Sequence, residues 1–267
     1  MRPALLSWGE SQRRDLPWRR TRDPWAILVS ELMLQQTQVP RVIPKYAAFL
    51  DEFPTPAVCA AAPRAAVVRA WAGLGYNRRA VSLHRAAIAI GDGPFPNTLA
   101  ALLALPGVGA YTARAVLTFA FEADVGVLEV NTSRVVARLT GAAATQAAAD
   151  DLVPAGQGWA WNQAMIDLGA TVCLRRDPRC GECPVRRWCR APGADAPPPT
   201  QQSRFEGSDR QGRGRLVDAL RSGPVAWADI AGVMGWPDDE RRARRVAETL
   251  IVDGLVDAGD GGLRLPA

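Results

Sequence analysis

The segment LPGVGAYTA, residues Leu105–Ala113, joins two stretches of helical periodicity, Leu99–Leu105 and Tyr111–Phe121. Gly107 and Gly109 permit a tight turn between the two predicted helices. Backbone amides exposed in such a turn, at the start of a new helix, can bind a phosphate group. The segment therefore predicts a helical hairpin with a phosphate site, although glycine-containing connections between helices are common and give only a modest signal alone.

The chain before and around this hairpin also has helical periodicity. Apolar residues recur at spacings of three and four in Trp25–Phe49 and Ala65–Ile90. Asp23 and Pro24 are typical of an N-cap and a first helical position. The alternation of apolar and polar residues that is typical of strands is not sustained anywhere before residue 207. The sequence therefore predicts a mostly helical protein.

Four cysteines follow the helical region with the spacing C-x6-C-x2-C-x5-C. They are Cys173, Cys180, Cys183 and Cys189. In a cytosolic chain this pattern is typical of ligands to an iron–sulfur cluster or zinc rather than of disulfides. The arginines around them are Arg175, Arg176, Arg179, Arg186, Arg187 and Arg190. Such a loop is either a rigid phosphate-binding surface or only a structural clamp, whereas the isolated Cys59 fits a core position.

The composition of the chain excludes several classes of protein and favours others. The chain has 267 residues, 48% of them hydrophobic, a net charge of +5 and a pI near 9.3, which suits a globular protein with a nucleic-acid partner. Apolar runs are too short for a membrane span and a signal peptide is not apparent, so we expect a cytoplasmic protein. The single histidine, His84, excludes HExxH zinc hydrolases and fits a core position. Because Lys45 is the only lysine, catalysis by a lysine amine is excluded unless Lys45 itself lies in the active site.

The last part of the chain has a different pattern. Ala191–Thr200 (APGADAPPPT) predicts a linker, and three short helices are expected in Arg213–Arg221, Trp227–Met234 and Asp238–Asp253. Leu255–Leu265 then predicts two strands around a glycine-rich turn. This order is typical of a winged helix, a module that often binds DNA. The third helix begins with four arginines, and a DNA-binding face and a solvated basic face are equally compatible with them.

Glu31 is a candidate general acid. It shares a face of the helix predicted after Pro24 with Ile27, Leu28 and Leu34. Desolvation on an apolar face raises the pKa of a carboxyl group, which favours proton donation near neutral pH. A salt-bridged helical glutamate is the ordinary alternative.

Several segments together resemble the adenine-specific mismatch DNA glycosylases (the MutY type) of the helix-hairpin-helix superfamily. They are LPWR (Leu16–Arg19), SELMLQQTQV (Ser30–Val39), GLGYNRRA (Gly73–Ala80), LPGVGAYTA, NTSRVVAR (Asn131–Arg138), NQAMIDLGA (Asn162–Ala170) and the four-cysteine spacing. The resemblance covers about residues 5–190 and implies an all-α, two-lobed fold with a [4Fe–4S] cluster. Residues 1–22 with 127–190 would form the cluster-bearing lobe and residues 23–126 the six-helix lobe. A linker, 191–206, and a winged-helix-like module, 207–267, would follow.

The resemblance also implies roles for individual residues. Glu31 matches the general acid that protonates the adenine ring, and Asn131 matches an amide that supports the active site. Gln36 matches the side chain that fills the gap left by the flipped adenine, and Tyr76 matches an aromatic wedge beside the opposite base, which is 8-oxoguanine in the family. The phosphate-gripping hairpin matches Gly107, Val108 and Gly109.

The sequence departs from the family at informative positions. Glu129 replaces an aspartate whose expected role is to stabilise the oxocarbenium ion that develops on the sugar, and it is longer by one methylene. Tyr111 occupies the place of the lysine nucleophile in relatives that also cleave the backbone, which predicts hydrolysis by water alone. Asn77 replaces a second tyrosine and Phe121 replaces a tyrosine. Residues 207–267 are too short for the family's usual domain that checks for 8-oxoguanine.

We therefore expect a monomeric, monofunctional glycosylase that removes adenine opposite 8-oxoguanine or guanine in double-stranded DNA. One alternative is a pyrimidine mismatch glycosylase on the same scaffold, and the QQT segment and Tyr76 favour adenine instead. The other is a DNA-binding protein impaired in catalysis, to which the Glu129 change points. Retention of Glu31 and Asn131 favours an enzyme, because binding alone requires neither.

Overall fold

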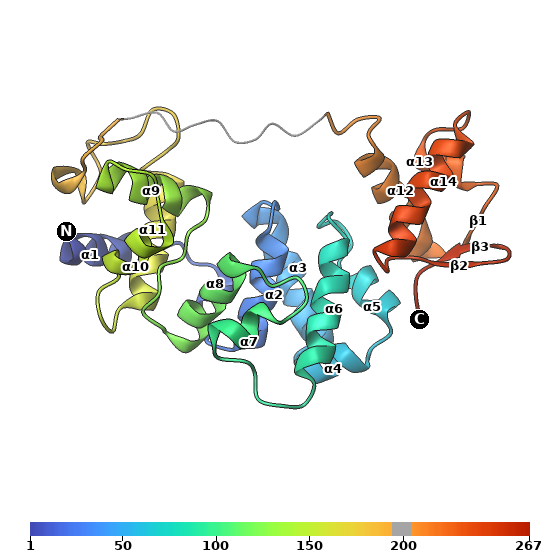
Figure 1. The fold of residues 1–267 in the computed structure, drawn as a ribbon, viewed down its shortest axis with the longest axis horizontal. Coiled ribbons are helices and arrows are strands. Elements are labelled where there is room, and N and C mark those ends of the chain that lie inside the picture. Colours follow the sequence, from blue (N-terminus) through green and yellow to red (C-terminus); the bar gives the residue numbers. More distant parts are fainter. Residues whose placement is uncertain (194–203) are drawn as a thin grey trace. The chain divides into compact units, whose positions relative to one another are not determined.

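The computed structural model describes residues 1–193 and 204–267, and these form helices and one small sheet (Figure 1). The helices of the first range are α1 (Arg2–Gln12), α2 (Pro24–Leu34), α3 (Val39–Glu52), α4 (Pro56–Ala61), α5 (Arg64–Ala70), α6 (Arg78–Ile90), α7 (Leu99–Leu103), α8 (Ala110–Phe121), α9 (Val130–Thr140), α10 (Gln146–Leu152) and α11 (Gly158–Thr171), with short 3-10 helices at Pro17–Arg19 and Arg186–Trp188. The second range contains α12 (Asp209–Ser222), β1 (Val225–Ala226), α13 (Ile230–Met234), α14 (Glu240–Val252), β2 (Asp257–Gly259) and β3 (Gly262–Arg264). The predicted helical class is confirmed.

The described residues group into two compact units. Unit 1 contains Met1–Leu28, Pro96–Ala104 and residues 108–193; unit 2 contains Val29–Phe95, Leu105–Gly107 and residues 204–267. The chain passes from one unit to the other within α2 and at the hairpin between α7 and α8. The lobe boundaries implied by the family resemblance stay a prediction. Most of the predicted linker, 191–206, lies outside the described residues.

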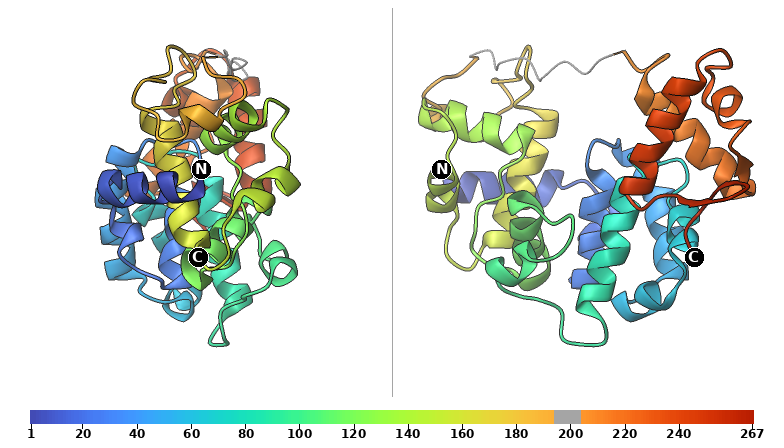
Figure 2. Two further views of the ribbon diagram at one scale, coloured as in Figure 1. Left: turned by 90° about the vertical axis from the view of Figure 1, so that its left-hand side faces the viewer. Right: turned by 45° about the vertical axis from the view of Figure 1, so that its right-hand side comes forward.

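Unit 1 has its core between α1, α9 and α11. Helix α1 packs against α11, as the views in Figures 1 and 2 agree. The core includes Leu5, Val135, Trp161 and Leu168, each buried to 1% exposure or less. A Cβ atom at Gly9 would lie only 2.6 Å from Cβ of Ala164, so the close packing of α1 on α11 requires glycine there.

A buried ion pair joins the LPWR segment to α11. Asp167 accepts hydrogen bonds from Nη1 of Arg19 at 2.6 Å, from Nη2 of Arg19 at 2.9 Å and from Nε of Arg14 at 2.6 Å. The Asp167 side chain is 1% exposed and that of Arg19 is 5% exposed. Desolvation alone would raise the pKa of Asp167, but the hydrogen bonds and charges of Arg19 and Arg14 lower it below its usual range. The carboxylate therefore stays ionised in the core.

The first part of unit 2 packs around aromatic side chains of α3 and the loop after α5. Phe49 contacts Trp71 edge-on at a ring-centroid distance of 6.0 Å. Cys59 is fully buried, as predicted, and burial raises the pKa of its thiol to about 12. His84 is also buried, with Nε2 3.0 Å from the carbonyl oxygen of Ala62, but its Nδ1 has no hydrogen-bond partner among the described residues.

Residues 204–267 form a module of three helices and a three-stranded antiparallel sheet with strand order β1-β3-β2. The predicted helices and the β2–β3 hairpin are confirmed, with Gly259 paired to Gly262 across the turn. Strand β1 was not predicted, because two residues are too short for a recognisable alternation. The module contacts α5: the amide of Ala65 donates to the carbonyl of Pro266 at 2.9 Å. Every helix among the described residues is too short or too polar to cross a membrane.

Replacing Asp167 by asparagine is expected to lower the free energy of unfolding by about 3 kcal/mol, because it leaves the buried Arg19 guanidinium without its counter-ion. The folded-state pKa of Asp167 lies below the unfolded value of about 3.9, so its stabilisation is present above that pH and is lost as pH falls through the folded-state pKa. Denaturant titrations at pH 7 and pH 3 measure both effects. The exposed partner of Arg20 provides the control: Asp15→Asn should leave stability nearly unchanged. Equal effects of the two substitutions would contradict the assigned role of the buried pair.

Candidate functional site

Glu31 lies on α2 and is 5% exposed. The helix begins as predicted: Oδ1 of Asp23 accepts a hydrogen bond from the amide of Ala26 at 2.8 Å, and Pro24 is the first helical residue. Ile27 and Leu28, on the same face, are exposed by 2% or less. The predicted setting of Glu31, a carboxyl group on an apolar helix face, is therefore confirmed.

Two exposed turns in unit 2 have strained backbones. Gln36, just after α2, has φ of +55°, and Tyr76, just before α6, has φ of +46°. Both values lie in the left-handed region, which residues other than glycine adopt at a cost of about 1 kcal/mol or more. Both side chains are exposed, Tyr76 by 41%. The family resemblance implies that these two residues insert into DNA, and that role stays a prediction.

The buried guanidinium of Arg79 joins these two turns. It donates to the carbonyls of Leu32, Met33 and Gln35 at the end of α2, and to those of Leu74, Gly75 and Tyr76 in the second turn. It also donates to the Thr37 hydroxyl at 3.0 Å. Burial lowers the pKa of Arg79 to about 10, which still leaves it charged at neutral pH. Arg79 thus positions Gln36 and Tyr76 relative to each other.

The second predicted carboxyl group, Glu129, is the N-cap of α9 in unit 1. Its Oε1 accepts from the amide of Thr132 at 2.9 Å, and its own amide donates to Oγ1 of Thr132 at 2.8 Å. Its Oε2 accepts from Nδ2 of Asn131 at 3.2 Å. Glu129 and Asn131 are therefore in contact, and the carboxylate is fixed in one orientation.

Arg134 holds Asn131 from the other side. Its Nη2 donates to Oδ1 of Asn131 at 2.8 Å and to the carbonyl of Gly169 at 2.6 Å, and its Nε donates to the carbonyl of Cys173 at 2.7 Å. A Cβ atom at Gly169 would lie 2.7 Å from Cβ of Asn131, so the NQAMIDLGA helix can approach Asn131 only through glycine. Arg134 links the candidate site to the cysteine loop.

The predicted hairpin lies between α7 and α8. Gly107 has φ of +79°, and a Cβ atom there would lie 2.5 Å from Cβ of Ser82, so both the conformation and the packing require glycine. Val108 is buried, Gly109 is the N-cap residue of α8, and Tyr111 is half-buried in the first turn of that helix. The structure thus places a tight turn with helix-start amides where the sequence predicted it.

The four clustered cysteines line one cavity in unit 1. They are Cys173, Cys180, Cys183 and Cys189, all half-buried. The buried Arg138 joins two of them: its Nη1 donates to Sγ of Cys173 at 3.2 Å, and its carbonyl accepts from Sγ of Cys189 at 3.2 Å. Burial raises the pKa of the Cys183 and Cys189 thiols, so a thiolate at either position requires a positive partner. Within the described ranges, histidine, cysteine and acidic side chains nowhere form a group of three that could hold a single metal ion.

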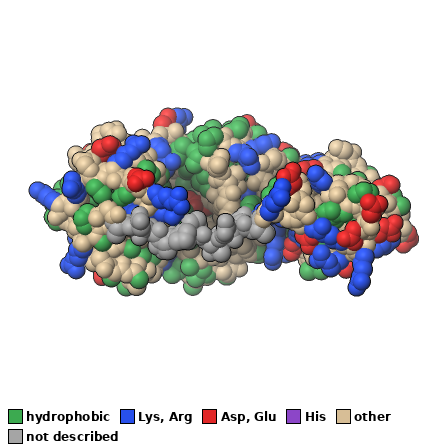
Figure 3. All heavy atoms as spheres, turned by 90° about the horizontal axis from the view of Figure 1, so that it is seen from above, with side chains coloured by type: hydrophobic (Ala, Val, Ile, Leu, Met, Phe, Trp, Pro, Cys, Tyr) green, Lys and Arg blue, Asp and Glu red, His purple; other side chains and the backbone are tan. Residues whose placement is uncertain are grey.

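The basic start of α14 is engaged within the C-terminal module. Arg242 and Arg245 both pair with Asp209 of α12, at 2.7 Å and 2.9 Å. The Arg242 guanidinium also lies 3.9 Å from the ring centroid of Trp236. Figure 3 shows basic and acidic side chains interspersed over this module. The possibility that α14 presents a free basic face for DNA is therefore not supported at these two arginines.

The structure groups the predicted site residues into separate clusters. Glu31, Gln36 and Tyr76 belong to unit 2, whereas Glu129, Asn131 and the cysteines belong to unit 1. The sequence did not identify Arg79 and Arg134 as positioning residues. Both arginines lie within the motifs that carry the family resemblance, GLGYNRRA and NTSRVVAR, and this could have indicated a role for them. An arginine in a helix is ordinarily exposed to solvent, so the motifs alone do not predict that these two act as positioning residues.

The N-cap role of Glu129 can be measured without any assay of activity. Glu129→Ala removes the acceptor for the Thr132 amide and should lower the free energy of unfolding by about 1 kcal/mol. Glu129→Gln keeps one side-chain oxygen and should retain most of that stability. Val130→Ala, at a neighbouring side chain that is 73% exposed, is the control and should change little. A Glu129→Ala protein as stable as the parent would show that the cap contributes nothing.

Comparisons with known proteins show the family of the chain. A family model described as "HhH-GPD superfamily base excision DNA repair protein" matches residues 29–152. An adenine DNA glycosylase of Mycolicibacterium smegmatis is 44% identical, with 98% of both chains covered, and the human adenine DNA glycosylase is 39% identical over 71% of this chain and 39% of its own.

Solved structures give the same result for the fold. A thermostable thymine-DNA glycosylase has a TM-score of 0.67 at 30% identity, covering 70% of this chain and 93% of its own. An endonuclease III–DNA covalent intermediate has a TM-score of 0.61 at 21% identity, covering 70% and 91%, which supports the fold alone. The predicted helix-hairpin-helix glycosylase fold is confirmed. The chain belongs to the adenine DNA glycosylases of the HhH-GPD superfamily of base excision DNA repair proteins.

Proposed function

We propose that this protein is a monofunctional glycosylase that removes adenine opposite 8-oxoguanine or guanine in double-stranded DNA. The observation that carries the proposal is the carboxyl group of Glu31, which is almost fully buried yet lies five residues before the exposed, strained Gln36. A buried carboxyl group next to a DNA-inserting turn suits proton donation to a base that has left the helix. The 44% identity to an adenine DNA glycosylase over nearly the whole chain supports adenine as that base.

In this mechanism Glu31 donates a proton to a ring nitrogen of adenine, and the N-glycosidic bond then breaks with its electron pair going to the base. The sugar becomes an oxocarbenium-like cation, which the Glu129 carboxylate stabilises electrostatically. A water molecule adds to the sugar and gives a proton to the Glu31 carboxylate, which restores the general acid and leaves an abasic site. The hydrogen bonds from Thr132 and Asn131 hold Glu129 ready for this role before the charge develops.

Contacts to DNA come from the strained turns and the hairpin. Gln36 fills the space left by the flipped adenine, and Tyr76 wedges beside the opposite base. Gly107, Val108 and Gly109, with Tyr111 in the following helix turn, bind a backbone phosphate through exposed amides. Because Tyr111 has no amine, an imine with the sugar does not form at this position and the strand is not cut.

We propose that the four clustered cysteines hold a [4Fe–4S] cluster. All four line one cavity, and the guanidinium of Arg138 already donates to one of the sulfur atoms. In such a cluster each thiolate binds a different iron atom, so the four sulfurs do not have to converge on one ion as they must around zinc. The bound cluster would supply a rigid cross-link that orders the arginine-rich loop for contact with phosphates.

A second candidate function is supported by one comparison. The likeness to a thymine-DNA glycosylase, at 30% identity, favours pyrimidine removal from mismatches on the same scaffold. We place adenine removal first, because the identity to the adenine enzyme is higher and extends over 98% of the chain. We further propose that the protein acts as a monomer in the cytoplasm.

The proposal is tested by incubating the protein with duplexes that each carry one mismatch and by detecting abasic sites as strand breaks after alkali. We expect product with adenine opposite 8-oxoguanine and opposite guanine. Glu31→Gln should reduce the single-turnover rate at least about 100-fold with little change in DNA binding, since general acid catalysis contributes about that much. The control is Glu52→Gln, the same change at an exposed carboxyl group on α3.

The same reactions distinguish the alternatives. Strand breaks should require alkali, and borohydride should trap no covalent complex. Product from thymine but not from adenine mismatches would establish the pyrimidine alternative. Binding without release of any base would show a protein impaired in catalysis.

The cluster is tested on the purified protein. We expect a brown protein with about four iron and four sulfide per chain. Cys183→Ser should reduce the colour and weaken DNA binding, whereas Cys59→Ala, at a buried cysteine outside the cavity, should keep both. A colourless protein with one equivalent of zinc would overturn the assignment.

A further inference from the structure

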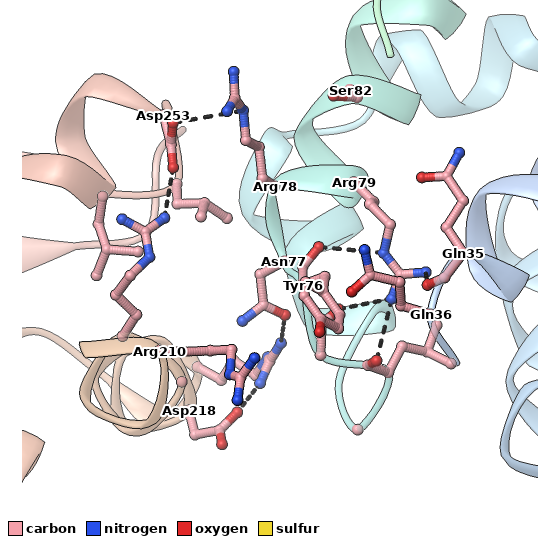
Figure 4. Close-up of a pocket in the computed structure, with 18 of the residues that line it drawn as sticks. Gln35, Gln36, Tyr76, Asn77, Arg78, Arg79, Ser82, Arg210, Asp218 and Asp253 are labelled. Carbon is pink, nitrogen blue, oxygen red and sulfur yellow. Dashed lines mark hydrogen bonds and ion pairs between the residues drawn. The ribbon is translucent and has the colours of Figure 1, made fainter. Parts of the chain in front are cut away.

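A cavity of about 790 Å³ in unit 2 lies between the Gln36 and Tyr76 turns and the C-terminal module (Figure 4). Its volume is in the range of pockets that hold small ligands, and one nucleotide would fit. One wall contains Gln35, Gln36, Tyr76 and Asn77, and the opposite wall is formed mainly by α12. The cavity therefore adjoins the residues proposed to enter DNA.

The lining of the cavity is strongly basic. It contains six arginines, Arg41, Arg78, Arg79, Arg210, Arg213 and Arg221, against two acidic residues, Asp218 and Asp253. The ring of Tyr76 and the amide groups of Gln35 and Asn77 add a stacking surface and hydrogen-bonding groups. Excess positive charge beside an aromatic ring and amides is the chemistry that recognises a nucleotide, through its phosphate and its base.

The two walls are tied together by polar contacts. Nη2 of Arg221 on α12 donates to Oδ1 of Asn77 at 3.0 Å, and Nε of Arg221 donates to the carbonyl of Val68 at 3.3 Å. Asp253, just after α14, pairs with Arg78 at 3.5 Å and with Arg213 at 2.5 Å. The turn that carries Tyr76 is thus fixed to the module on both sides of the cavity.

The module has one other basic region, the start of α14, and two of its arginines are paired with Asp209. Three other arginines of the module, Arg210, Arg213 and Arg221, line the cavity from α12. We infer that this cavity binds one nucleotide of the DNA strand opposite the target adenine, with its phosphate beside Arg210 and Arg41 and its base against Tyr76. The module then contacts DNA through α12 instead of through the helix that a winged helix ordinarily uses. The choice of strand rests on the proposed function.

The inference is tested by DNA binding rather than by base release. Duplexes carrying an uncleavable abasic-site analogue are titrated at several salt concentrations, and the affinity and its salt dependence are measured. Arg210→Ala should weaken binding several-fold and reduce the slope of log affinity against log salt by about one, as expected for a lost phosphate contact. Arg241→Ala removes one charge from α14 of the same module and should leave the slope unchanged.

A second pair of variants tests whether weaker binding could result from misfolding instead of from a change in the cavity. Gly214 of α12 lines the cavity and Gly232 of α13 does not, and a Cβ atom at either would meet nothing within 4 Å. Gly214→Glu should therefore fold, place a negative charge in the cavity and weaken binding at least as strongly as Arg210→Ala. Gly232→Glu adds the same charge elsewhere and should have a much smaller effect.

The outcomes separate this inference from the proposed function. If Arg210→Ala matches Arg241→Ala and Gly214→Glu matches Gly232→Glu, the cavity does not bind DNA, even where the parent protein releases adenine. If the parent releases no adenine but the paired variants differ as expected, the proposed function is wrong and the nucleotide site stands.

Discussion

The hydrogen bonds of one buried guanidinium, that of Arg79, determine the geometry of the proposed DNA-facing part of unit 2. The end of α2 and the turn before α6 both leave carbonyl groups that need donors once they are buried. Arg79 satisfies carbonyls of both segments at the same time, so the positions of Gln36 and Tyr76 are no longer independent. Its charge also costs desolvation, which such a dense set of acceptors offsets.

In unit 1, arginine side chains also hold the candidate residues in place through several hydrogen bonds each. Arg134 donates to Asn131 and to backbone carbonyls of α11 and the cysteine loop, and Arg138 donates to a cysteine sulfur. An arginine suits these places better than a lysine because its planar group reaches several acceptors in fixed directions. The abundance of arginine in this chain is therefore structural in part, and it does not only reflect attraction to phosphate.

Much of the fold and part of the site could be predicted from local patterns. The Asp23–Pro24 helix start, the Gly107 turn and the setting of Glu31 depend on neighbours in sequence, and the structure has each of them. The roles of Arg79 and Arg138 could not be predicted, because a long side chain can bond to a segment far away in sequence. The arginines at the start of α14 illustrate the converse. Their sequence is compatible with a free basic face, but Arg242 and Arg245 pair with Asp209, which is more than 30 residues away in the chain.

The contact between Arg221 and Asn77 also couples two positions that lie 144 residues apart in the chain. Position 77 is a second tyrosine in the family pattern, and a tyrosine ring there would displace the amide oxygen that accepts from Arg221. The hydrogen bond needs both partners, so a change at either position removes the same interaction. The energetic effects of changes at the two positions are therefore not expected to add.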